Sequence, residues 1–568
     1  IMLSFLLAWA VRGNKAVAVM PQFLSNAGTM VPLAYLQLWL GMKIWPGRVG
    51  DVDAAVQTLR TASDAWTWSD PKSSVGILGQ AMTELGSEIG GPLMIGVVVT
   101  GTFLAAVAYP VSLILISYLQ AERVRRRAMR GIGLRPPRGF LEIHDEATDP
   151  EASTVLSYAV RPQTYVKADS ATLLVDGRQA YPEMLRGIEQ ARQSVEMETY
   201  ILRPDGTGKR FAEALKGAAK RGVSVRLAYD GVGGMGVPQE YIDDLLREGV
   251  RVAIYRPFAM LWRLGLGRMN RRNHRKMLVI DQTVSFTGGL NIGDEYAAAE
   301  EGGGGWRDTH VKLVGEKPAR ALLVLMAQTW RRSHEYTLNE QKPVIAGKLS
   351  APVSEDVKNA LKHSQLQKTP EPPPHMPVEE PPHTSLNVPV QILSNKEFLQ
   401  RVRIRHAYLN AIHKARRYIL IENGYFIPDR GIRRALRTAV KRGVQVGVVV
   451  AMYSDVHVAA LASRALYGDL LSSGVRLFEY PVAMLHSKVA VIDDTWSVVS
   501  SYNLDHRSLV HNLEAGVFLL DRPFAKALRQ QILADIRRSR EVTLQFHKSR
   551  PWNEALAESL AYQAHHWL

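Results

Sequence analysis

Residues 274–291 read HRKMLVIDQTVSFTGGLN, and residues 486–503 read HSKVAVIDDTWSVVSSYN. Each stretch contains His-x-Lys-x4-Asp and then, after six intervening residues, two small residues, any residue and an Asn. A single His-x-Lys pair is weak evidence, because His and Lys often lie on strand surfaces by chance. Two copies with equal spacing instead predict that one structural unit occurs twice in the chain.

The sequences that precede the two motifs also resemble each other. Residues 214–230 read ALKGAAKRGVSVRLAYD, and residues 435–455 read ALRTAVKRGVQVGVVVAMYSD. Both patterns predict a helix, an Arg-Gly turn and a buried strand rich in β-branched residues. The alternation predicts an α/β fold with two pseudo-symmetric repeats, each a sheet flanked by helices, preceded by N-terminal transmembrane helices.

Composition suggests where the segments of the chain begin and end. The predicted segments are a membrane region with transmembrane helices at 1–120, a basic juxtamembrane connector at 121–163, the first repeat at 164–340, a Pro-rich linker at 341–388, the second repeat at 389–548 and a C-terminal tail at 549–568. The linker sequence TPEPPPHMPVEEPPHTS has no periodicity that would build a core.

The strongest membrane signal is the almost uncharged stretch Pro92–Leu119. It exceeds the roughly 20 residues that a helix needs to cross a bilayer. The alternative is a buried helix of a soluble domain. Seven arginines follow between Ala121 and Arg138. By the positive-inside rule this flank is cytoplasmic, and such a cluster also suits anionic lipid headgroups.

Charge and composition limit the possible chemistry. The formal net charge is +16, which favours anionic partners such as nucleic acid or anionic lipid. The chain has no cysteine, so disulfides, Cys-zinc sites and thiol nucleophiles are excluded. No cluster with metal-ligand spacing is evident either, so neither a metal nor another cofactor is predicted.

The motif residues suit phosphoryl transfer. His and Lys at positions i and i+2 of a strand lie on the same face. If the two copies meet, the ammonium groups and Asn amides can hold phosphate oxygens, while one imidazole attacks phosphorus and the other protonates the leaving alcohol. The motif Asp either orients an imidazole or anchors the turn. The predicted catalytic residues are His274, Lys276, Asp281 and Asn291 of the first motif and His486, Lys488, Asp493 and Asn503 of the second.

The two motifs resemble those of the phospholipase D superfamily, and the resemblance covers about residues 164–548. It implies that the two halves share one active site, that one His becomes a covalent phosphohistidine and that no metal is needed. Carried over by motif, His274 is the nucleophile and His486 the acid/base. The turns depart from the usual Gly-Ser, with Gly-Gly in the first half and Ser-Ser in the second. A required turn hydroxyl would therefore come from Ser500 or Ser501.

Four further stretches are similar to bacterial cardiolipin synthases: EMETYILRPDGTGKRFAEAL from Glu196, RMNRRNHRK from Arg268, NGYFIPDRGIRRAL from Asn423 and SYNLDHRSLVHNLEAGV from Ser501. The resemblance suggests that Glu514, and Asp308 in WRDTH of the first half, orient the opposing His. The alternative is a buried polar network that supports the turn. The predicted supporting or substrate-binding residues are Gly289, Ser501, Asp308 and Glu514.

The predicted function is a membrane-anchored phosphatidyltransferase that forms cardiolipin or a related phospholipid through a phosphohistidine. Its substrates would be anionic phospholipids such as phosphatidylglycerol, at the bacterial inner membrane with the catalytic domain on the cytoplasmic side. The alternatives are a phospholipase D that yields phosphatidic acid, a phosphodiesterase or nuclease, and a non-catalytic membrane scaffold. No aromatic–basic stacking platform stands out, so no nucleic acid partner is expected. A homo-oligomer remains possible. Residues 255–272 alternate apolar and basic side chains before His274 and form either an interfacial segment or a core-covering loop.

Overall fold

The computed structural model describes residues 152–257, 271–338, 381–395 and 402–563. The predicted membrane region, most of the basic connector, most of the linker and residues 258–270 of the apolar and basic stretch lie outside these ranges. No helix in the described part of the chain combines the length and the apolar character that crossing a bilayer requires.

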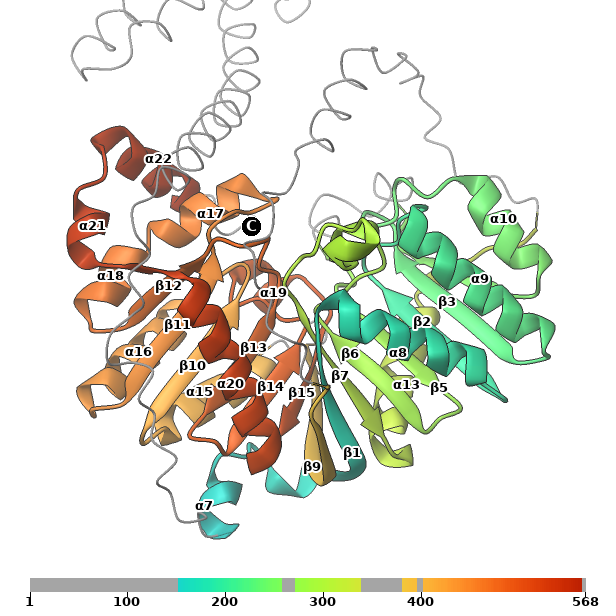
Figure 1. Cartoon of the computed structure of the whole chain (residues 1–568), viewed down its shortest axis with the longest axis horizontal. Helices are drawn as coiled ribbons and strands as arrows, with labels where there is room; N and C mark the ends of the chain where they lie inside the picture. Colours follow the sequence, from blue (N-terminus) through green and yellow to red (C-terminus); the bar gives the residue numbers. More distant parts are fainter. Residues whose placement is uncertain (1–151, 258–270, 339–380, 396–401, 564–568) are drawn as a thin grey trace, which may run out of the picture. The chain divides into compact units, whose positions relative to one another are not determined.

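The described strands form one sheet in which each half carries eight strands in equivalent positions (Figure 1). The first half contains β1 (Val166–Val175), β2 (Ser194–Thr199), β3 (Ser224–Asp230), β4 (Arg251–Tyr255), β5 (Met277–Ile280), β6 (Val284–Gly288), β7 (Thr309–Val314) and β8 (Ser333–Glu335). The second half contains β9 (Thr384–Asn395), β10 (Tyr418–Asn423), β11 (Gln445–Ala451), β12 (Arg476–Tyr480), β13 (Lys488–Ile492), β14 (Trp496–Ser500), β15 (Glu514–Leu519) and β16 (Arg540–Val542).

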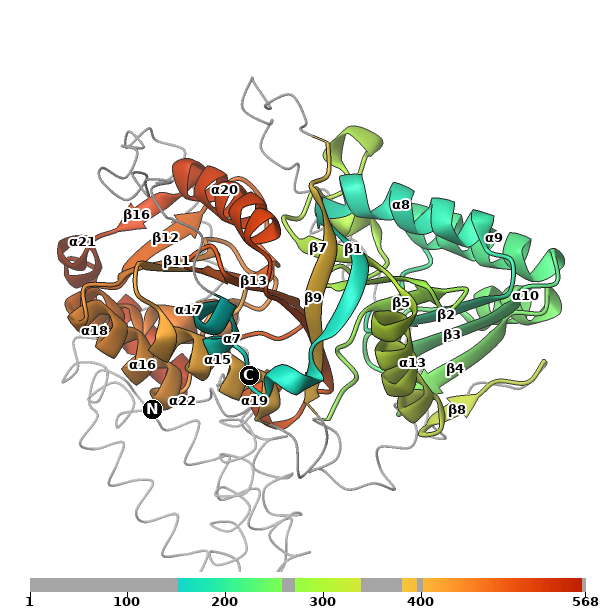
Figure 2. The ribbon, with the colours of Figure 1, turned by 90° about the horizontal axis from the view of Figure 1, so that it is seen from below.

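The order of strands is a mirror image about the centre of the sheet. It runs β16-β12-β11-β10-β13-β14-β15-β9 and then β1-β7-β6-β5-β2-β3-β4-β8. In each half the second, third and fourth strands are parallel, whereas the other pairs are antiparallel. The halves join where β1 pairs antiparallel with β9, with Val166 opposite Val390 (Figure 2). The predicted α/β fold with a duplicated sheet is therefore confirmed.

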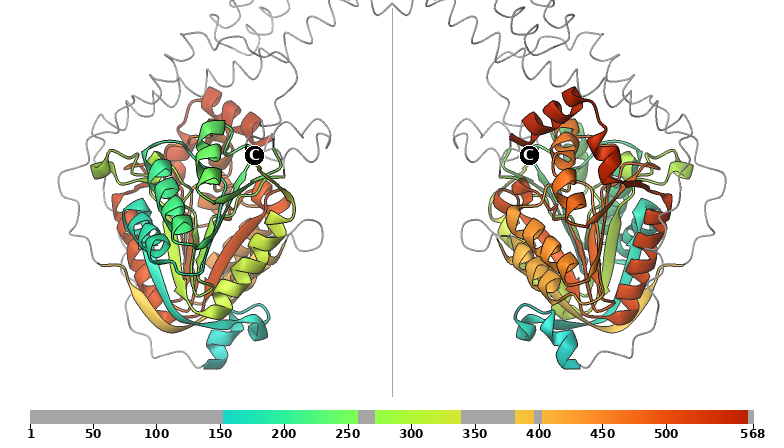
Figure 3. Two further views of the ribbon diagram at one scale, coloured as in Figure 1. Left: turned by 90° about the vertical axis from the view of Figure 1, so that its right-hand side faces the viewer. Right: turned by 90° about the vertical axis from the view of Figure 1, so that its left-hand side faces the viewer.

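Helices cover both faces of each half-sheet (Figure 3). In the first half α8 (Asp176–Gln190), α9 (Gly206–Lys220) and α10 (Gln239–Arg247) lie on one face and α13 (Glu316–Trp330) on the other. In the second half α15 (Arg403–Lys414), α16 (Arg430–Lys441), α17 (His457–Arg464) and α18 (Tyr467–Ser472) lie on one face and α20 (Arg522–Arg538) on the other. Alternate side chains of β5 show why: Leu278 faces the core under α8 and α9, and Met277 faces α13.

The repeated helix–turn–strand unit has the same local signals in both halves. The side chain of Asp205 caps α9 by accepting from one main-chain N–H of the first turn, and that of Asp429 caps α16 by accepting from two. After each helix a glycine adopts the left-handed conformation, Gly222 with φ of 85° and Gly443 with φ of 88°. A residue with a side chain would be strained there, which explains the Arg-Gly turn.

One predicted boundary differs from the structure, and two other predicted segments contain helices. Strand β9 begins at Thr384, inside the segment predicted to be linker, because it extends to pair with β1. The connector contains a short helix, α7 (Ala152–Ser157), and a 3-10 turn, η1 (Pro162–Thr164). The C-terminal tail contains α22 (Trp552–Gln563), which packs against α17 and follows α21 (Leu544–Lys548).

Candidate active site

The two motifs meet between the repeats, and main-chain hydrogen bonds hold each motif to the opposite half. His274 N–H donates to the carbonyl of Leu513 at 3.0 Å, just before β15 of the second half. At the equivalent place in the other half, His486 N–H donates to the carbonyl of Arg307 at 2.8 Å, just before β7 of the first half. Because each of these segments continues directly into an acidic residue, a carboxylate from one repeat is brought beside the imidazole of the other.

Each motif histidine forms a hydrogen bond with that carboxylate. His274 Nδ1 lies 3.1 Å from both oxygens of Glu514, and His486 Nδ1 lies 2.7 Å from Oδ2 of Asp308. His274 Nδ1 also lies 3.2 Å from the carbonyl oxygen of Ser501. These partners are acceptors, so each Nδ1 carries the proton and each Nε2 is left as the basic nitrogen. The two carboxylate–imidazole pairs expected from the sequence are both present.

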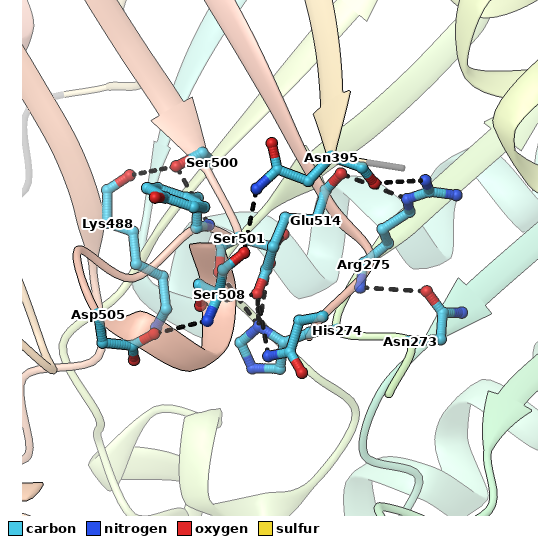
Figure 4. Close-up of polar contacts among 12 residues, drawn as sticks. Asn273, His274, Arg275, Asn395, Lys488, Ser500, Ser501, Asp505, Ser508 and Glu514 are labelled. Carbon is cyan, nitrogen blue, oxygen red and sulfur yellow. Dashed lines mark hydrogen bonds and ion pairs between the residues drawn. The ribbon is translucent and has the colours of Figure 1, made fainter. Parts of the chain in front are cut away.

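The Glu514 carboxylate is held by several donors (Figure 4). Ser508 Oγ donates to it at 2.9 Å and Asn512 Nδ2 at 3.1 Å, and the hydroxyl of Ser501 donates as well. Burial alone would raise the pKa of Glu514, but the adjacent His274 and Lys276 lower it below the ordinary value. The carboxylate is therefore ionised and fixed in direction.

Burial sets the protonation of the two imidazoles and the two ammonium groups. Burial lowers the pKa of His274 to about 4 and the pKa of His486 well below its ordinary value, so both imidazoles are neutral at pH 7 in this environment. Burial also lowers the pKa of Lys488 to about 8 and that of Lys276 further. An anionic phosphate entering the site would oppose these shifts, because it favours the charged forms.

The lysines and asparagines of the motifs differ in how they are bonded. Lys276 Nζ donates to the carbonyl of His274 at 2.7 Å, and Lys488 Nζ donates to that of His486. The Asn291 amide is occupied at both ends, by the N–H of Ile201 at 3.0 Å and the hydroxyl of Tyr296 at 2.6 Å. The buried Asn503 has a side-chain oxygen with no protein partner among the described residues, so one end of its amide remains available.

The motif aspartates do not lie at this site, which corrects the prediction that Asp281 and Asp493 are catalytic. Asp281 follows β5 whereas His274 precedes it, so the strand carries them to opposite ends, about 20 Å apart along the chain. The Asp281 carboxylate accepts three main-chain N–H groups of residues 192–194, at 2.7–2.9 Å. Asp493 accepts those of residues 416–418 at 2.6–2.9 Å. The geometry therefore favours the alternative that these aspartates anchor turns.

Gly289 and Ser501 occupy equivalent positions in the two turns but act differently. A Cβ atom at Gly289 would lie 2.0 Å from Oδ1 of Asp308, so only glycine leaves room for this carboxylate. Ser501 instead donates its hydroxyl to Glu514. The Gly-Gly and Ser-Ser turns thus fit two differently shaped half-sites.

Aromatic rings line the imidazoles, and the sequence analysis did not single them out. The ring of Tyr200 lies 5.0 Å from that of His274, and the rings of Tyr296 and Trp306 lie 5.4 Å and 5.7 Å from that of His486. Tyr200 lies in EMETYIL, two residues after the buried Glu198 and within a stretch already quoted for the family resemblance. This place in the sequence is the signal that could have identified it. Within the described ranges no group of three or more His, Asp or Glu side chains is arranged to hold a metal ion.

Comparison with known proteins identifies relatives over most of the chain. A family model described as "Cardiolipin synthase, PLD-like domain" matches residues 184–300 and 408–536, and one described as "Uncharacterized protein conserved in bacteria" matches residues 1–125. The chain is 32% identical over 391 residues to cardiolipin synthase 1 of Staphylococcus aureus, covering 68% of this chain and 71% of that protein. It is 30% identical over 406 residues to cardiolipin synthase of Geobacillus kaustophilus, covering 72% and 74%.

A solved structure supports the fold assignment. The crystal structure of phosphatidylserine synthase from Haemophilus influenzae matches with a TM-score of 0.51 and 13% sequence identity, over 72% of this chain and 97% of that one. At this identity the likeness concerns the fold alone.

Proposed function

The chain belongs to the cardiolipin synthase family of the phospholipase D superfamily, and we propose that it transfers a phosphatidyl group to a lipid alcohol, forming cardiolipin or a related phospholipid. The observation that carries this proposal is the pair of buried imidazoles, each with a basic Nε2 and each oriented by a carboxylate from the other repeat. Two such groups in one site can supply a nucleophile and an acid/base without a cofactor.

In the first step His274 Nε2 attacks the phosphorus of a phospholipid. The bond from phosphorus to the headgroup oxygen breaks as the bond to nitrogen forms, and His486 gives its proton to the departing alkoxide. His486 must be protonated for this step. Asp308 and the incoming anionic phosphodiester both favour that form, against the burial that lowers the pKa of His486.

In the second step an acceptor alcohol loses its proton to His486 and attacks the same phosphorus, and the bond from phosphorus to His274 breaks. Both steps place negative charge on the phosphoryl oxygens. Lys276 and Lys488 are buried and each donates to the main-chain carbonyl of its motif histidine, and in their charged forms they stabilise that charge in a site shielded from water. No metal and no other cofactor takes part in this scheme.

The environments of the two imidazoles support the assignment of roles. A phosphohistidine that keeps its Nδ1 proton carries a positive charge on the ring, so it needs a firmly ionised neighbour. Glu514 has a lowered pKa and several hydrogen-bond donors, whereas burial raises the pKa of Asp308. His274 beside Glu514 therefore suits the covalent intermediate, and His486 beside Asp308 suits proton transfer.

The substrates that we propose are anionic phospholipids such as phosphatidylglycerol, at the cytoplasmic side of a bacterial inner membrane. The basic net charge and the apolar N-terminal sequence support this placement. A lipid alcohol at the membrane surface reaches the intermediate at high local concentration, and that advantage over water is worth several kcal/mol when the alcohol is well oriented. Hydrolysis to phosphatidic acid is the competing outcome.

The test is product analysis with the full chain in phosphatidylglycerol vesicles. Mass spectrometry should find more cardiolipin-like product than phosphatidic acid, in the presence of EDTA as well as in its absence. The His274→Ala variant is the control for contaminating activity. If phosphatidic acid dominates even at high lipid density, the enzyme is a hydrolase and the transferase proposal is wrong.

A further inference from the structure

One buried arginine makes contacts in both repeats beside His486. The side chain of Arg307 is 5% exposed, and its Nη1 donates to the main-chain carbonyl of Asp308 at 2.6 Å and to Oδ1 of Asp176 at 2.7 Å. Its Nε donates to Oδ2 of Asp535 at 2.9 Å. Asp176 begins α8 of the first repeat and Asp535 belongs to α20 of the second. The guanidinium therefore ties the two repeats together next to Asp308.

The same contacts fix the main chain of Asp308 on both sides. Asp176 Oδ1 accepts the N–H of Asp308 at 2.9 Å, while the N–H of Asp176 donates to the carbonyl of Asp308 at 2.9 Å. The carbonyl of Arg307 in turn accepts the N–H of His486 at 2.8 Å. Arg307 thus holds both members of the pair: its guanidinium bonds the main chain of Asp308, and its carbonyl bonds the main chain of His486.

The two halves of the site fix their carboxylates in different ways. Glu514 receives the side-chain donors Ser501, Ser508 and Asn512. Asp308 Oδ1 receives only the N–H of Thr309 among the hydrogen bonds of the described residues. A serine equivalent to Ser501 cannot stand at Gly289, because its Cβ would clash with Asp308. The direction of the Asp308 carboxylate must therefore come from its main chain.

We propose that Arg307, with Asp176 and Asp535, is a positioning residue that aims Asp308 at His486 and so supports proton transfer in the reaction. This inference rests on the proposed function, in which His486 is the acid/base. It predicts that loss of the guanidinium impairs protonation of the leaving group and leaves attack by His274 largely intact.

Leaving-group dependence separates this role from a general contribution to folding. A phosphatidyl ester of p-nitrophenol releases a phenolate that needs little protonation, whereas phosphatidylglycerol releases an alkoxide that needs a proton. In single-turnover experiments with the full chain, Arg307→Gln should slow the reaction of phosphatidylglycerol about tenfold more than the reaction of the nitrophenyl ester. The factor is smaller than that expected for loss of the general acid itself, because His486 is still present. Asp176→Asn keeps an acceptor oxygen but removes the negative charge that faces the guanidinium, and it should show the same selectivity to a smaller degree.

Two controls make the result decisive. Arg529→Gln removes another buried arginine of α20, whose Nη1 donates to Oδ2 of Asp494 at 2.7 Å. It should slow both substrates equally if at all. His486→Ala should show the leaving-group dependence at full size. Equal slowing of both substrates by Arg307→Gln and by Asp176→Asn would overturn the positioning role.

The two proposals fail in distinguishable ways. If His486→Ala shows the dependence and the Arg307 and Asp176 variants do not, the positioning proposal alone is wrong. If His486→Ala shows no dependence, its role as the acid is wrong, and the positioning proposal falls with it. Should Arg307→Gln not fold, Arg307→Lys carries the test, because lysine keeps the charge but cannot bond Asp308, Asp176 and Asp535 together.

Discussion

Each imidazole at the centre of the site has a separate task, and its replacement should therefore have a separate signature. Both His274→Ala and His486→Ala should lower turnover by orders of magnitude, because the two groups act as one unit. With the phosphatidyl ester of p-nitrophenol, whose leaving group needs little protonation, the His486→Ala chain should accumulate a phosphatidyl adduct on His274, detected by peptide mass spectrometry, while His274→Ala should show none. Near-normal turnover in either variant would contradict a shared site.

The turn residues next to the carboxylates provide a second residue-scale prediction. Ser501→Ala removes one charge-assisted hydrogen bond to Glu514, worth about 1.5–3 kcal/mol, and should slow turnover roughly ten- to a hundredfold. Gly289→Ser should be at least as harmful, because its Cβ would lie 2.0 Å from Oδ1 of Asp308. Steady-state assays of the two variants test this, and wild-type activity in Gly289→Ser would show that Asp308 can move aside without consequence.

A buried glutamate behind the site should make stability depend on pH. Glu198 accepts from Asn273 at 2.9 Å and from Thr329 at 3.3 Å, and burial raises its pKa to about 7. A carboxyl group whose pKa is higher in the folded state binds its proton more tightly there. The stabilisation that Glu198 adds to the free energy of unfolding is therefore fully present below its unfolded pKa, and it is lost as the pH rises through 7.

Glu198→Gln keeps this site neutral at every pH. Relative to wild type, its free energy of unfolding should improve between pH 5 and pH 8, by at most about 3 kcal/mol. Urea unfolding at the two pH values measures the difference, and any constant cost of the Gln amide cancels. A difference that is independent of pH would mean that Glu198 is already ionised in the folded protein.

At the scale of elements, the motif aspartates stabilise turns and do not take part in the reaction. Asp281→Asn keeps the size of the side chain but replaces a carboxylate that accepts three main-chain N–H groups. The loss should lower stability by about 1–3 kcal/mol, while turnover of the folded protein at low temperature should change little. Thermal unfolding and assays at that temperature separate the two effects. A loss of turnover as large as that of His274→Ala would return Asp281 to the catalytic residues.

Local patterns predicted elements well where they were strongly periodic. The helix, Arg-Gly turn and strand predicted within residues 214–230 are present as α9, which ends at Lys220, and β3, which spans Ser224–Asp230. The start of β9 was missed, because Pro389 and the polar residues around Thr384 hide its alternation, and pairing with β1 is what extends it. Spacing alone likewise could not place Asp281, since the motif does not say how far the intervening strand carries its end from the histidine.

At the scale of the whole molecule, the duplication was readable from the sequence and the resemblance suggested the carboxylate partners, but the main-chain pairing that carries each carboxylate to the other half came from the structure. Glu514 and Asp308 are named by the family resemblance, yet only the pairing of Leu513 with Arg272 and of Arg307 with Met484 brings them to the opposing motif. Arg307 was overlooked because an arginine beside an aspartate in a sequence usually indicates a solvated surface. Its burial depends on α8 and α20, which are far apart in the chain.

Because the halves exchange essential groups, they should work together even when the chain between them is cut. A protease site placed within residues 345–375 would allow cleavage of the purified full chain. The antiparallel β1–β9 pair and the main-chain bonds at both motifs cross between the halves without using this segment. We therefore expect the fragments to co-elute in size-exclusion chromatography and to retain most of the phosphatidyltransferase activity.

The phosphatidyltransferase activity of each repeat alone should be lower than that of the intact chain by orders of magnitude. Without the second repeat His274 loses both Glu514 and the acid/base His486, and without the first His486 loses Asp308 and the nucleophile. A chain with the protease site scrambled controls for the protease itself. If the cut fragments stay together but lose activity, covalent continuity matters for the geometry of the site. If one repeat alone retains activity, the reaction does not need the two motifs in one site.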